Sequence, residues 1–224
     1  MFEVLKKPII GWAIDPLLKL KNMGVIDRII TVVGFLGNQV IDYLGKKSEF
    51  VWQKDQLGTA HAVQVAERLI ANEEAITIIT NGDHALYSYQ TYEKMLNRFV
   101  DNNLTLAFCV VKSKTQFDNY GRVIRNLSGQ ITRIAEPPDI TEDEAKIEER
   151  STNLYVVDNK WLFSVLGRIR PAGPKNEYYI NAIVKLAIDE GKKVEAVEIS
   201  NNFEAMGINT LEDLAQTEKI LRRK

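Results

Sequence analysis

The sequence predicts an α/β protein in which helices cover both faces of a sheet. Short apolar segments rich in Ile and Val alternate with segments of helical spacing through the first half of the chain. This alternation is typical of a mostly parallel sheet with crossover helices. In the second half, two short strands joined by a Ser-Gly turn predict a hairpin. The fold class we expect is therefore α/β with a mixed sheet.

The individual elements follow from local patterns. Pro8 suits the first turn of a helix, and Gly24 suits its end. In the rest of the first half we expect strands over 26–34, 50–53, 75–80 and 104–112, and helices over 38–44, 59–71 and 88–101. In the second half we expect strands over 122–126, 130–136, 152–157 and 194–199, helices over 158–166, 177–190 and 210–221, a charged surface segment over 141–150 and a mobile loop over 168–176. We find no linker, which predicts that both halves share one sheet.

Composition excludes several classes of function. The chain has 224 residues and a formal net charge of −1, with no basic run, so a nucleic-acid groove is not expected. Cys109, the single cysteine, lies in an apolar run and is expected to be buried; an intrachain disulfide is excluded, which fits a reducing cytoplasm. No segment is apolar enough to span a bilayer, and Met1 begins no signal-peptide pattern. We therefore expect a cytoplasmic protein without a membrane or nucleic-acid partner.

One junction between a strand and a helix is suited to reading a nucleobase. It has the sequence Gln53-Lys-Asp-Gln-Leu-Gly-Thr-Ala-His-Ala62. Gly58 would let a base approach the backbone, and the helix start offers free N–H groups. The alternative is structural, with Thr59 capping the helix and Gly58 forming the turn before it.

Two polar residues are candidates for a metal site. Asp83 follows an apolar strand, where ligands bind in open α/β sheets, and its carboxylate could hold Mg²⁺ against a phosphate. Asn209, after the last predicted strand, could add an amide oxygen. The alternatives are a turn or cap aspartate for Asp83 and helix capping for Asn209, with Thr210 as another cap.

Three further segments suggest a sugar pocket. In Tyr120-Gly121-Arg122, the glycine would permit close approach of a ligand or would simply open a strand. Glu136 precedes two prolines and could accept two sugar hydroxyls, or it is an edge-strand charge. Tyr178 and Tyr179 could pack on a sugar face, although aromatic residues at a helix start are more often core.

Taken in order, these motifs resemble the sugar-1-phosphate nucleotidyltransferases. The resemblance is greatest to the uridylyltransferase (pyrophosphorylase) domain of bacterial N-acetylglucosamine-1-phosphate uridylyltransferase. It rests on Gln-x-x-Gln-Leu-Gly-Thr-Ala-His-Ala, Gly-Asp, Tyr-Gly-Arg, Glu-Tyr-Tyr and Gly-x-Asn, and on Lys7-Pro8-Ile9 at the first helix. Five motifs in one order are far more specific than any one of them, and they span essentially the whole chain.

The resemblance implies a fold and a site. The fold is a Rossmann-like mixed sheet of the nucleotide-diphospho-sugar transferase, or GT-A-like, type. It forms one domain over residues 1–224, with a nucleotide-binding half over 1–112 and a sugar-binding half over 113–224. The implied nucleotide residues are Gln53, Gln56, Gly58, Thr59 and Gly82; the sugar residues are Gly121, Glu136, Ser151 and Tyr179; the Mg²⁺ residues are Asp83 and Asn209.

The chain also departs from the pattern of this family. Residues 1–224 contain no Leu-Ala-Ala-Gly-x-Gly-Thr-Arg-Met loop and no Pro-Lys pair after it, so we expect the first strand to be missing, a gap in the sheet and doubtful activity. Ser151 replaces a sugar-binding Asn, Asn153 replaces a Gly, and Pro138 lies near the place of a frequent Lys. Residues 1–224 also contain no hexapeptide repeats of the kind that form the family's acetyltransferase domain.

Three hypotheses follow. The first is a uridylyltransferase fold, incomplete at its N-terminus, that converts UTP and N-acetylglucosamine-1-phosphate, or a related sugar-1-phosphate, into UDP-sugar and pyrophosphate with Mg²⁺. The second is a non-catalytic subunit that binds a nucleotide sugar or regulates another chain. The third is a nucleotidyltransferase for another nucleobase or hexose. The expected partners are UTP or a UDP-sugar and a sugar-1-phosphate, with a homo-oligomer or a partner chain that completes the sheet.

Overall fold

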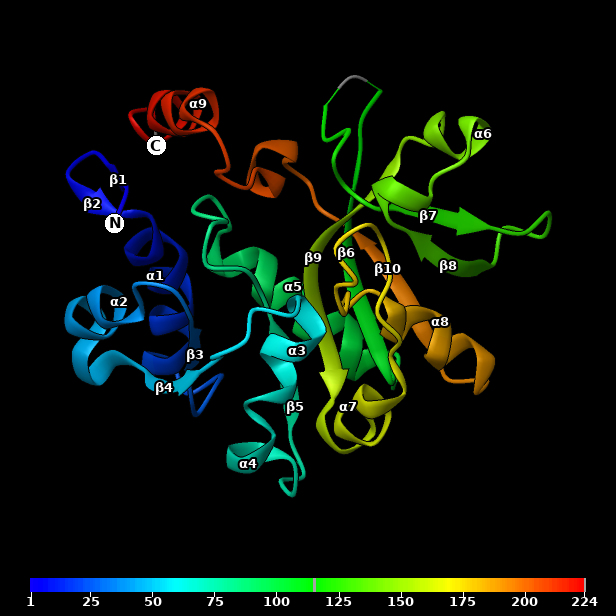
Figure 1. The fold of residues 1–224 in the computed structure, drawn as a ribbon, viewed down its shortest axis with the longest axis horizontal. Helices are drawn as coiled ribbons and strands as arrows, with labels where there is room; N and C mark the ends of the chain where they lie inside the picture. The colour runs from blue at the N-terminus through cyan, green and yellow to red at the C-terminus, as the bar shows by residue number, and fades with distance from the viewer. Residues whose placement is uncertain (115, 224) are drawn as a thin grey trace.

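The main body of the protein is a mixed six-stranded sheet. The structure is a computed structural model that describes residues 1–114 and 116–223 (Figure 1). The strand order is β10-β6-β9-β7-β8, and β5 also pairs with β9. These strands are β5 (Ile76–Ile79), β6 (Leu106–Lys112), β7 (Arg122–Arg125), β8 (Ile131–Ala135), β9 (Glu149–Asp158) and β10 (Val194–Glu198). Elements from both halves of the chain thus share one sheet, as the absence of a linker predicts.

Strand β9 makes the sheet less parallel than the strand–helix alternation predicts. It pairs with both β5 and β6, and both pairings are antiparallel, whereas β10 and β6 are parallel. The register between β6 and β9 shifts between Phe108 and Val110, and Asn153 lies in the shifted part of β9 with φ +58°. Asparagine tolerates this left-handed conformation better than most residues, so Asn153 can stand where the family pattern has glycine.

A second, two-stranded sheet lies apart from the first. Strands β3 (Ile30–Val33) and β4 (Glu49–Trp52) are parallel, and they pair only with each other among the described residues. Figure 1 shows this pair beside α2 (Gly37–Leu44), on the opposite side of the molecule from β7 and β8. One edge of β3 and one edge of β5 therefore carry no strand partner within the described chain. This arrangement agrees with the expected gap in the sheet.

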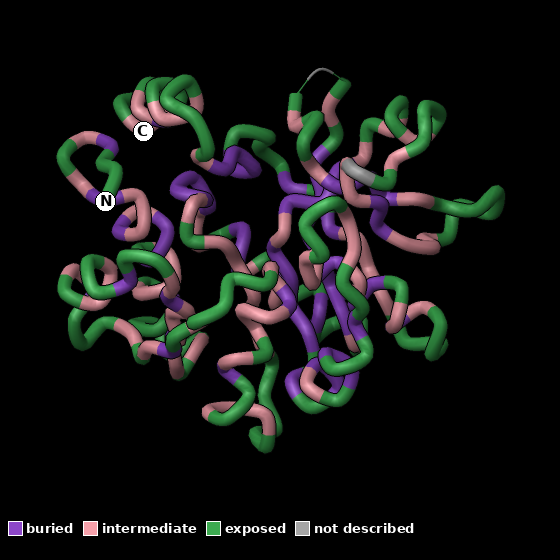
Figure 2. Tube along the Cα trace, in the orientation of Figure 1, coloured by how far each residue is buried: buried purple, intermediate pink, exposed green. Residues whose placement is uncertain are grey.

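Helices cover both faces of the six-stranded sheet, as predicted. On one face, α7 (Asn159–Val165) and α8 (Ala182–Asp189) pack on alternate residues of β6 and β9, such as Phe108 and Tyr155. On the other face, α1 (Ile9–Asn22) and α5 (Tyr89–Asp101) pack on the intervening residues, including Cys109. Figure 2 shows that burial is concentrated in this sheet and its helices. Cys109 is fully buried as predicted, and burial raises the pKa of its thiol to about 12.

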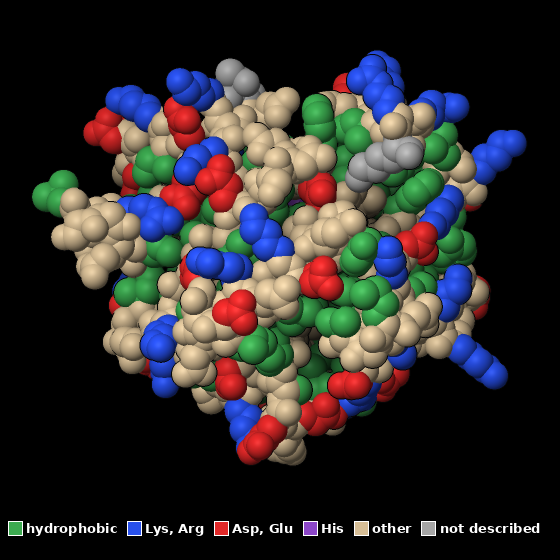
Figure 3. All heavy atoms as spheres, turned by 180° about the vertical axis from the view of Figure 1, so that it is seen from behind, with side chains coloured by type: hydrophobic (Ala, Val, Ile, Leu, Met, Phe, Trp, Pro, Cys, Tyr) green, Lys and Arg blue, Asp and Glu red, His purple; other side chains and the backbone are tan. Residues whose placement is uncertain are grey.

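The remaining elements are short. They are β1 (Glu3–Val4), β2 (Lys7–Pro8), α3 (Thr59–Gln64), α4 (Glu67–Ile70), α6 (Glu142–Ala145), α9 (Leu211–Leu221) and four 3₁₀ turns at Gly45–Lys47, Pro137–Asp139, Leu166–Arg168 and Asn202–Ala205. No helix in the described residues is long and apolar enough to cross a membrane. On the face shown in Figure 3, Lys and Arg side chains lie among Asp and Glu side chains, in line with the low net charge.

Three predicted elements differ from the observed ones. The strand expected over 26–34 is only Ile30–Val33, and the helix expected over 59–71 is broken by a turn at Val65 and Ala66. The helix expected over 177–190 begins at Ala182. Its first turn is absent because the backbone of Tyr178 bonds instead to Leu57 and Ala60, and Glu177 bridges Ala172.

Candidate active site

The predicted nucleobase motif is held in place by backbone contacts. Tyr178 donates its N–H to the Leu57 carbonyl, at 2.8 Å, and accepts a hydrogen bond from the Ala60 N–H at 2.8 Å. Gly58 lies between these two bonds with φ +110°. A Cβ atom there would lie 2.7 Å from both the nitrogen and the oxygen of Tyr178, so only glycine fits.

Thr59 does not cap the helix that it begins. The N-cap position of α3 is Gly58, which has no side chain to offer, and the Thr59 hydroxyl accepts a hydrogen bond from the Ile180 N–H at 2.9 Å. The capping alternative for Thr59 is therefore wrong. The hydroxyl instead fastens the nucleobase motif to the segment that leads into α8.

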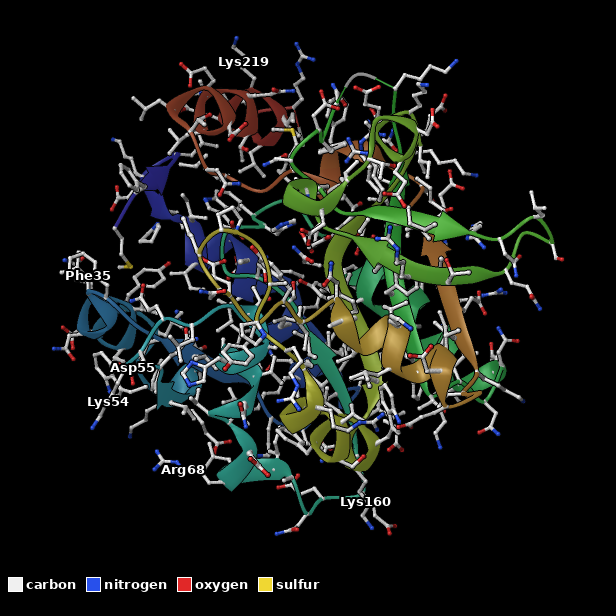
Figure 4. The ribbon with its side chains drawn as sticks, turned by 45° about the vertical axis from the view of Figure 1, so that its right-hand side comes forward. Phe35, Lys54, Asp55, Arg68, Lys160 and Lys219 are labelled. Carbon is white, nitrogen blue, oxygen red and sulfur yellow. The ribbon has the colours of Figure 1, made fainter. Side chains whose placement is uncertain are left out.

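Gln53 directly follows β4, and contacts with Gly58 and His61 fix the orientation of its side chain. Its side-chain nitrogen donates to the Gly58 carbonyl at 3.0 Å and lies 3.1 Å from Nδ1 of His61. These two contacts occupy the amide nitrogen and leave the amide oxygen for another donor. The side chains labelled in Figure 4 show that Lys54 and Asp55, which follow Gln53, lie on the same side of the molecule as Phe35.

The predicted sugar residues Glu136 and Tyr179 meet in one cavity of about 330 Å³. Asn181 lies there too and donates its side-chain N–H to the Glu136 carboxylate. Burial raises the pKa of Glu136 to about 7, against the lowering effect of the Asn181 hydrogen bond. Burial also raises the pKa of Tyr179, with help from the nearby acidic groups. The cavity can therefore offer a carboxylate, an amide and a phenol to a polyhydroxylated ligand.

Gly121 lies beside two residues that line this cavity, Ile134 and Asn181, and Ser151 bonds to Gly121. The Ser151 N–H donates to the Gly121 carbonyl at 2.9 Å. A Cβ on Gly121 would lie 2.6 Å from the Ile134 side chain and 3.6 Å from the Asn181 amide nitrogen. The Ser151 hydroxyl is buried and has no hydrogen-bond partner among the described residues. An unpaired buried hydroxyl costs about 1–3 kcal/mol, which a polar ligand or a water could recover.

The two predicted metal residues are brought together by a backbone hydrogen bond. The Ile208 N–H donates to the Asp83 carbonyl at 3.1 Å, which sets Asn209 beside Asp83. One carboxylate oxygen of Asp83, Oδ1, is buried and has no hydrogen-bond partner within the described chain. It lies 3.9 Å from Nε2 of His84; burial lowers the pKa of this imidazole, against the raising effect of the Asp83 carboxylate.

Neither metal candidate acts as a helix cap. The cap of α5 is Ser88, and the cap of α9 is Thr210, which forms a capping box with Asp213. Asn209 contributes only its backbone N–H, which donates to Asp213 at 3.0 Å. The side chain of Asn209 lines a second cavity, of about 200 Å³, together with Tyr120 and Gly207. The capping alternatives for Asp83 and Asn209 are thus wrong. The turn alternative for Asp83 is confirmed because Gly82 and Asp83 form a turn, and Thr210, the alternative cap to Asn209, is the observed one.

These residues fit a divalent cation of the Mg²⁺ type. A carboxylate oxygen and an amide oxygen are the hard donors that Mg²⁺ prefers, and nucleotide phosphates commonly complete its shell. The orphaned Oδ1 of Asp83 is the kind of buried acceptor that a cation satisfies. In residues 1–114 and 116–223, no three His, Cys, Asp or Glu side chains cluster as a metal site would need, so an all-protein metal cage is not present.

Contacts link the predicted nucleotide residues to the predicted sugar residues. Thr59 bonds to Ile180, the next residue, Asn181, bonds to Glu136, and Gly121 precedes Arg122 in β7 beside them. Two predicted residues lie outside these contacts. Gln56 is exposed and its side chain packs by Gly34, and Gly82 is exposed against Ile10.

The sequence patterns missed three residues of this region. Asn181 and His84 are both 4% exposed, and Tyr120 contacts the loop before Asn209. The signal for Asn181 was a single amide inside the apolar run Ile180–Ala187. Tyr120 belongs to the Tyr-Gly-Arg motif and His84 directly follows Asp83, but the patterns assign neither residue a role of its own, because their contacts with residues 205–207 come from a distant part of the chain.

Comparisons with known proteins agree with this arrangement. The profile of the family "Nucleotidyl transferase" matches residues 1–218. The bifunctional protein GlmU of Limosilactobacillus reuteri is 34% identical over 224 residues, which are 100% of this chain and 48% of that protein. GlmU of Bacillus subtilis is 32% identical over 226 residues, again 100% of this chain and 48% of that protein. The chain thus spans about half the length of these relatives.

A solved structure shows the same fold. It is CMP:2-keto-3-deoxy-manno-octonic acid synthetase complexed with CTP, which superposes with a TM-score of 0.70 at 13% identity and covers 99% of this chain and 90% of that one. At this identity the likeness concerns the fold alone. The family profile and the curated relatives settle the family: the chain belongs to the nucleotidyl transferases and is related to the uridylyltransferase domain of GlmU.

Proposed function

We propose that this chain binds UTP and N-acetylglucosamine-1-phosphate, or a related sugar-1-phosphate, as a uridylyltransferase. The observation that carries the proposal is the link between the Gln53–Thr59 motif and the Tyr178–Asn181 segment. This link joins a surface suited to a base with a cavity suited to a sugar. A nucleotide sugar has both parts, and a single ligand can therefore use both surfaces.

On the nucleotide side, Gln53 is the residue that reads uracil. Its amide nitrogen is held by Gly58 and His61, so its amide oxygen is free to accept the N3–H of uracil. Cytosine has no N–H at that ring position, which makes the contact selective. Gly58 and Thr59 form the floor under the base, and Gln56 and Gly82 flank it. In this proposal residues 1–112 of a single domain hold the nucleotide and residues 113–224 hold the sugar.

On the sugar side, Glu136 and Asn181 hold hydroxyl and amide groups of the hexose. The carboxylate accepts sugar O–H groups once it is ionised, and Asn181 keeps it in position. Ser151 offers a buried hydroxyl that lacks a partner among the described residues, and Tyr179 closes the cavity. These groups bind and orient the sugar-1-phosphate without bonding to it covalently.

The reaction is an in-line displacement. An oxygen of the sugar phosphate forms a bond to the α-phosphorus of UTP, and the bond from that phosphorus to the bridging oxygen breaks. The electron pair leaves with pyrophosphate. The protein contributes by placing the two substrates in line and by offsetting charge, and it needs no nucleophile of its own. When bound, Mg²⁺ would supply charge neutralisation at the phosphates, with Asp83 and Asn209 as the residues that hold it.

A second candidate function is binding without turnover. It is favoured by the sequence content of residues 1–224, which includes no Gly-rich loop to hold a triphosphate, and by the unpaired edges of β3 and β5. A segment or a partner chain that adds a strand between these edges could bring such a loop. Losing even one preorganised donor costs about a hundredfold or more in rate.

The test is Mg²⁺-dependent release of pyrophosphate from UTP and N-acetylglucosamine-1-phosphate. Turnover that the substitution Asp83→Asn abolishes would support the uridylyltransferase. No turnover, together with calorimetric binding of UDP-N-acetylglucosamine, would favour binding alone, and a version of the chain extended by an apolar strand and a Gly-rich loop should then gain activity. If the protein shows neither turnover nor binding of UDP-N-acetylglucosamine, the proposal is refuted.

The nucleobase is tested separately. Ser151 and Pro138 depart from the family pattern, and this departure is the basis of the third hypothesis, a nucleotidyltransferase for another nucleobase or hexose. A competition series with UTP, dTTP, CTP and GTP should show preference for the two nucleotides that carry an N3–H beside two carbonyl groups. A preference for CTP or GTP would contradict the role of Gln53.

A further inference from the structure

The hydroxyl of Tyr120 bridges two backbone groups of the loop before Asn209. It donates to the Ala205 carbonyl at 2.6 Å and accepts from the Gly207 N–H at 2.9 Å. Tyr120 comes from the segment before β7, 85 residues away from Ala205 in sequence. Burial raises the pKa of Tyr120 to about 12, so the phenol stays neutral and can serve as donor and acceptor at once.

The loop is held at three places. Glu204 accepts hydrogen bonds from the N–H of Ser88 and the hydroxyl of Thr91, which anchors the loop to the start of α5. Ile208 donates to the Asp83 carbonyl. Between these anchors, Tyr120 provides the only side-chain hydrogen bonds to residues 205–207 within the described part of the chain.

The space around Gly207 leaves little freedom. A Cβ on Gly207 would lie 3.1 Å from Nε2 of His84, 3.3 Å from the Asn209 amide nitrogen and 3.3 Å from the Tyr120 hydroxyl. The Asn209 side chain thus sits against the same backbone unit that Tyr120 fixes. Without the hydroxyl, the Ala205 carbonyl and the Gly207 N–H lose this partner, and the backbone before Asn209 is held by the Glu204 and Ile208 anchors on either side.

We propose that Tyr120 is a positioning residue for the metal site, which acts by holding the Ala205–Gly207 backbone so that Asn209 faces Asp83. This inference rests on the metal role of Asp83 and Asn209 in the proposed function. Because Tyr120 directly precedes Gly121 beside the sugar cavity, it also joins the sugar side of the site to the metal side.

The test compares Tyr120→Phe with Tyr92→Phe. Tyr92 is a buried tyrosine whose hydroxyl lies 3.2 Å from that of Thr80, so its substitution also removes a buried hydroxyl contact, without touching the Asn209 loop. Binding of Mn²⁺–UTP is measured by water-proton relaxation, and binding of UTP alone by calorimetry in EDTA. Thermal unfolding measures the structural cost of each substitution.

We expect Tyr120→Phe to weaken binding of Mn²⁺–UTP about tenfold, or about 1.4 kcal/mol, while UTP binding in EDTA stays within twofold of wild type. Tyr92→Phe should lower thermal stability similarly and leave both affinities unchanged. If wild type binds Mn²⁺–UTP normally and Tyr120→Phe binds it with the same affinity, the role of Tyr120 is overturned but the proposed metal site is not. A wild-type protein that binds UTP without any Mn²⁺ enhancement overturns the proposed metal site, and the inference with it.

Discussion

The β3–β4 pair and the six-stranded sheet differ sharply in burial. In β6 every residue from Leu106 to Val111 is buried, whereas in β3 only Val33 is. The core beside the β3–β4 pair has three buried apolar residues, Ile14, Ile29 and Leu44, while the sheet has a large core on each face. Because hydrophobic burial is the main source of stability, the two regions should differ in how readily they open.

This difference divides the proposed site. Gln53 directly follows β4 and belongs to the less buried region, whereas Asp83 lies in the turn after β5, Glu136 follows β8 and Asn181 precedes α8, all next to the six-stranded sheet. The Gly58–Tyr178 contact connects the two regions. The metal and sugar sides of the site are therefore preorganised in the free protein. The nucleotide side depends on the Gly58–Tyr178 junction, which a bound ligand can stabilise.

The largest expected effect is in hydrogen exchange of the free protein. Amides of β6 and β9 should exchange about a hundredfold more slowly than amides of β3 and β4, because they open only with the main core. Exchange followed by mass spectrometry measures both regions in one sample. Equal protection would mean that the two regions unfold as one unit, which would break the comparison.

The substitution Gly58→Ala should damage the junction. A Cβ at this position would lie 2.7 Å from backbone atoms of Tyr178. The alanine would also have to adopt the φ of +110° that Gly58 has. We expect the free energy of unfolding to fall by about 2–4 kcal/mol and binding of UDP-N-acetylglucosamine to be lost. Chemical denaturation and calorimetry measure the two effects.

Gly129→Ala is the matched control. Gly129 also has a positive φ, +79°, but a Cβ there would meet nothing within 4 Å. Gly129→Ala should lower the free energy of unfolding by about 1 kcal/mol, because of backbone strain alone, and should leave nucleotide-sugar binding unchanged. A similar loss in both variants would show that strain, and not the contact with Tyr178, explains the effect of Gly58→Ala.

The metal side should respond independently of the β3–β4 region. Asp83→Asn is expected to weaken binding of Mn²⁺–UTP by at least about tenfold, because it removes the only charged ligand of the proposed site. The free energy of unfolding should change by less than about 1 kcal/mol. Asp101→Asn, at the exposed end of α5, is the control that should change neither quantity. Unaltered relaxation data for Asp83→Asn would exclude this carboxylate as a ligand.

The smallest expected effect concerns the pH dependence of stability. Burial raises the pKa of Glu136 to about 7, so the folded protein holds this proton more tightly than the unfolded chain, whose carboxyl titrates near 4.5. Stability is therefore lost as pH rises from about 4.5 to about 7, and the loss persists above that pH. Glu136→Gln cannot ionise and should gain about 1 kcal/mol over wild type between pH 5 and pH 6. Denaturant midpoints at both pH values measure this gain, and parallel curves for the two proteins would contradict it.

Much of the fold could be predicted from the sequence, because local patterns decide local structure. Pro8 at the start of α1 and the apolar run of β6 each correspond to an observed element. The antiparallel insertion of β9 between β5 and β6 could not be predicted this way, since a strand's neighbours are set by contacts across the whole chain.

The candidate site shows the same limit. Motif order predicts site roles for Gly58, Asp83 and Asn209, and the structure shows why a glycine is required at 58. The start of α8 was misplaced because Tyr178 bonds to Leu57 and Ala60, a pairing between segments about 120 residues apart. Tyr120 was missed for the same reason, since its partners Ala205 and Gly207 lie on a distant loop.

The central claim is that one nucleotide sugar occupies both sides of this site. Hydrogen exchange with and without UDP-N-acetylglucosamine tests it most directly, with residues 53–60 and 177–182 followed as separate peptides. The account predicts that both segments gain protection together and at the same ligand concentration. Protection of only one segment, or of neither, would contradict it.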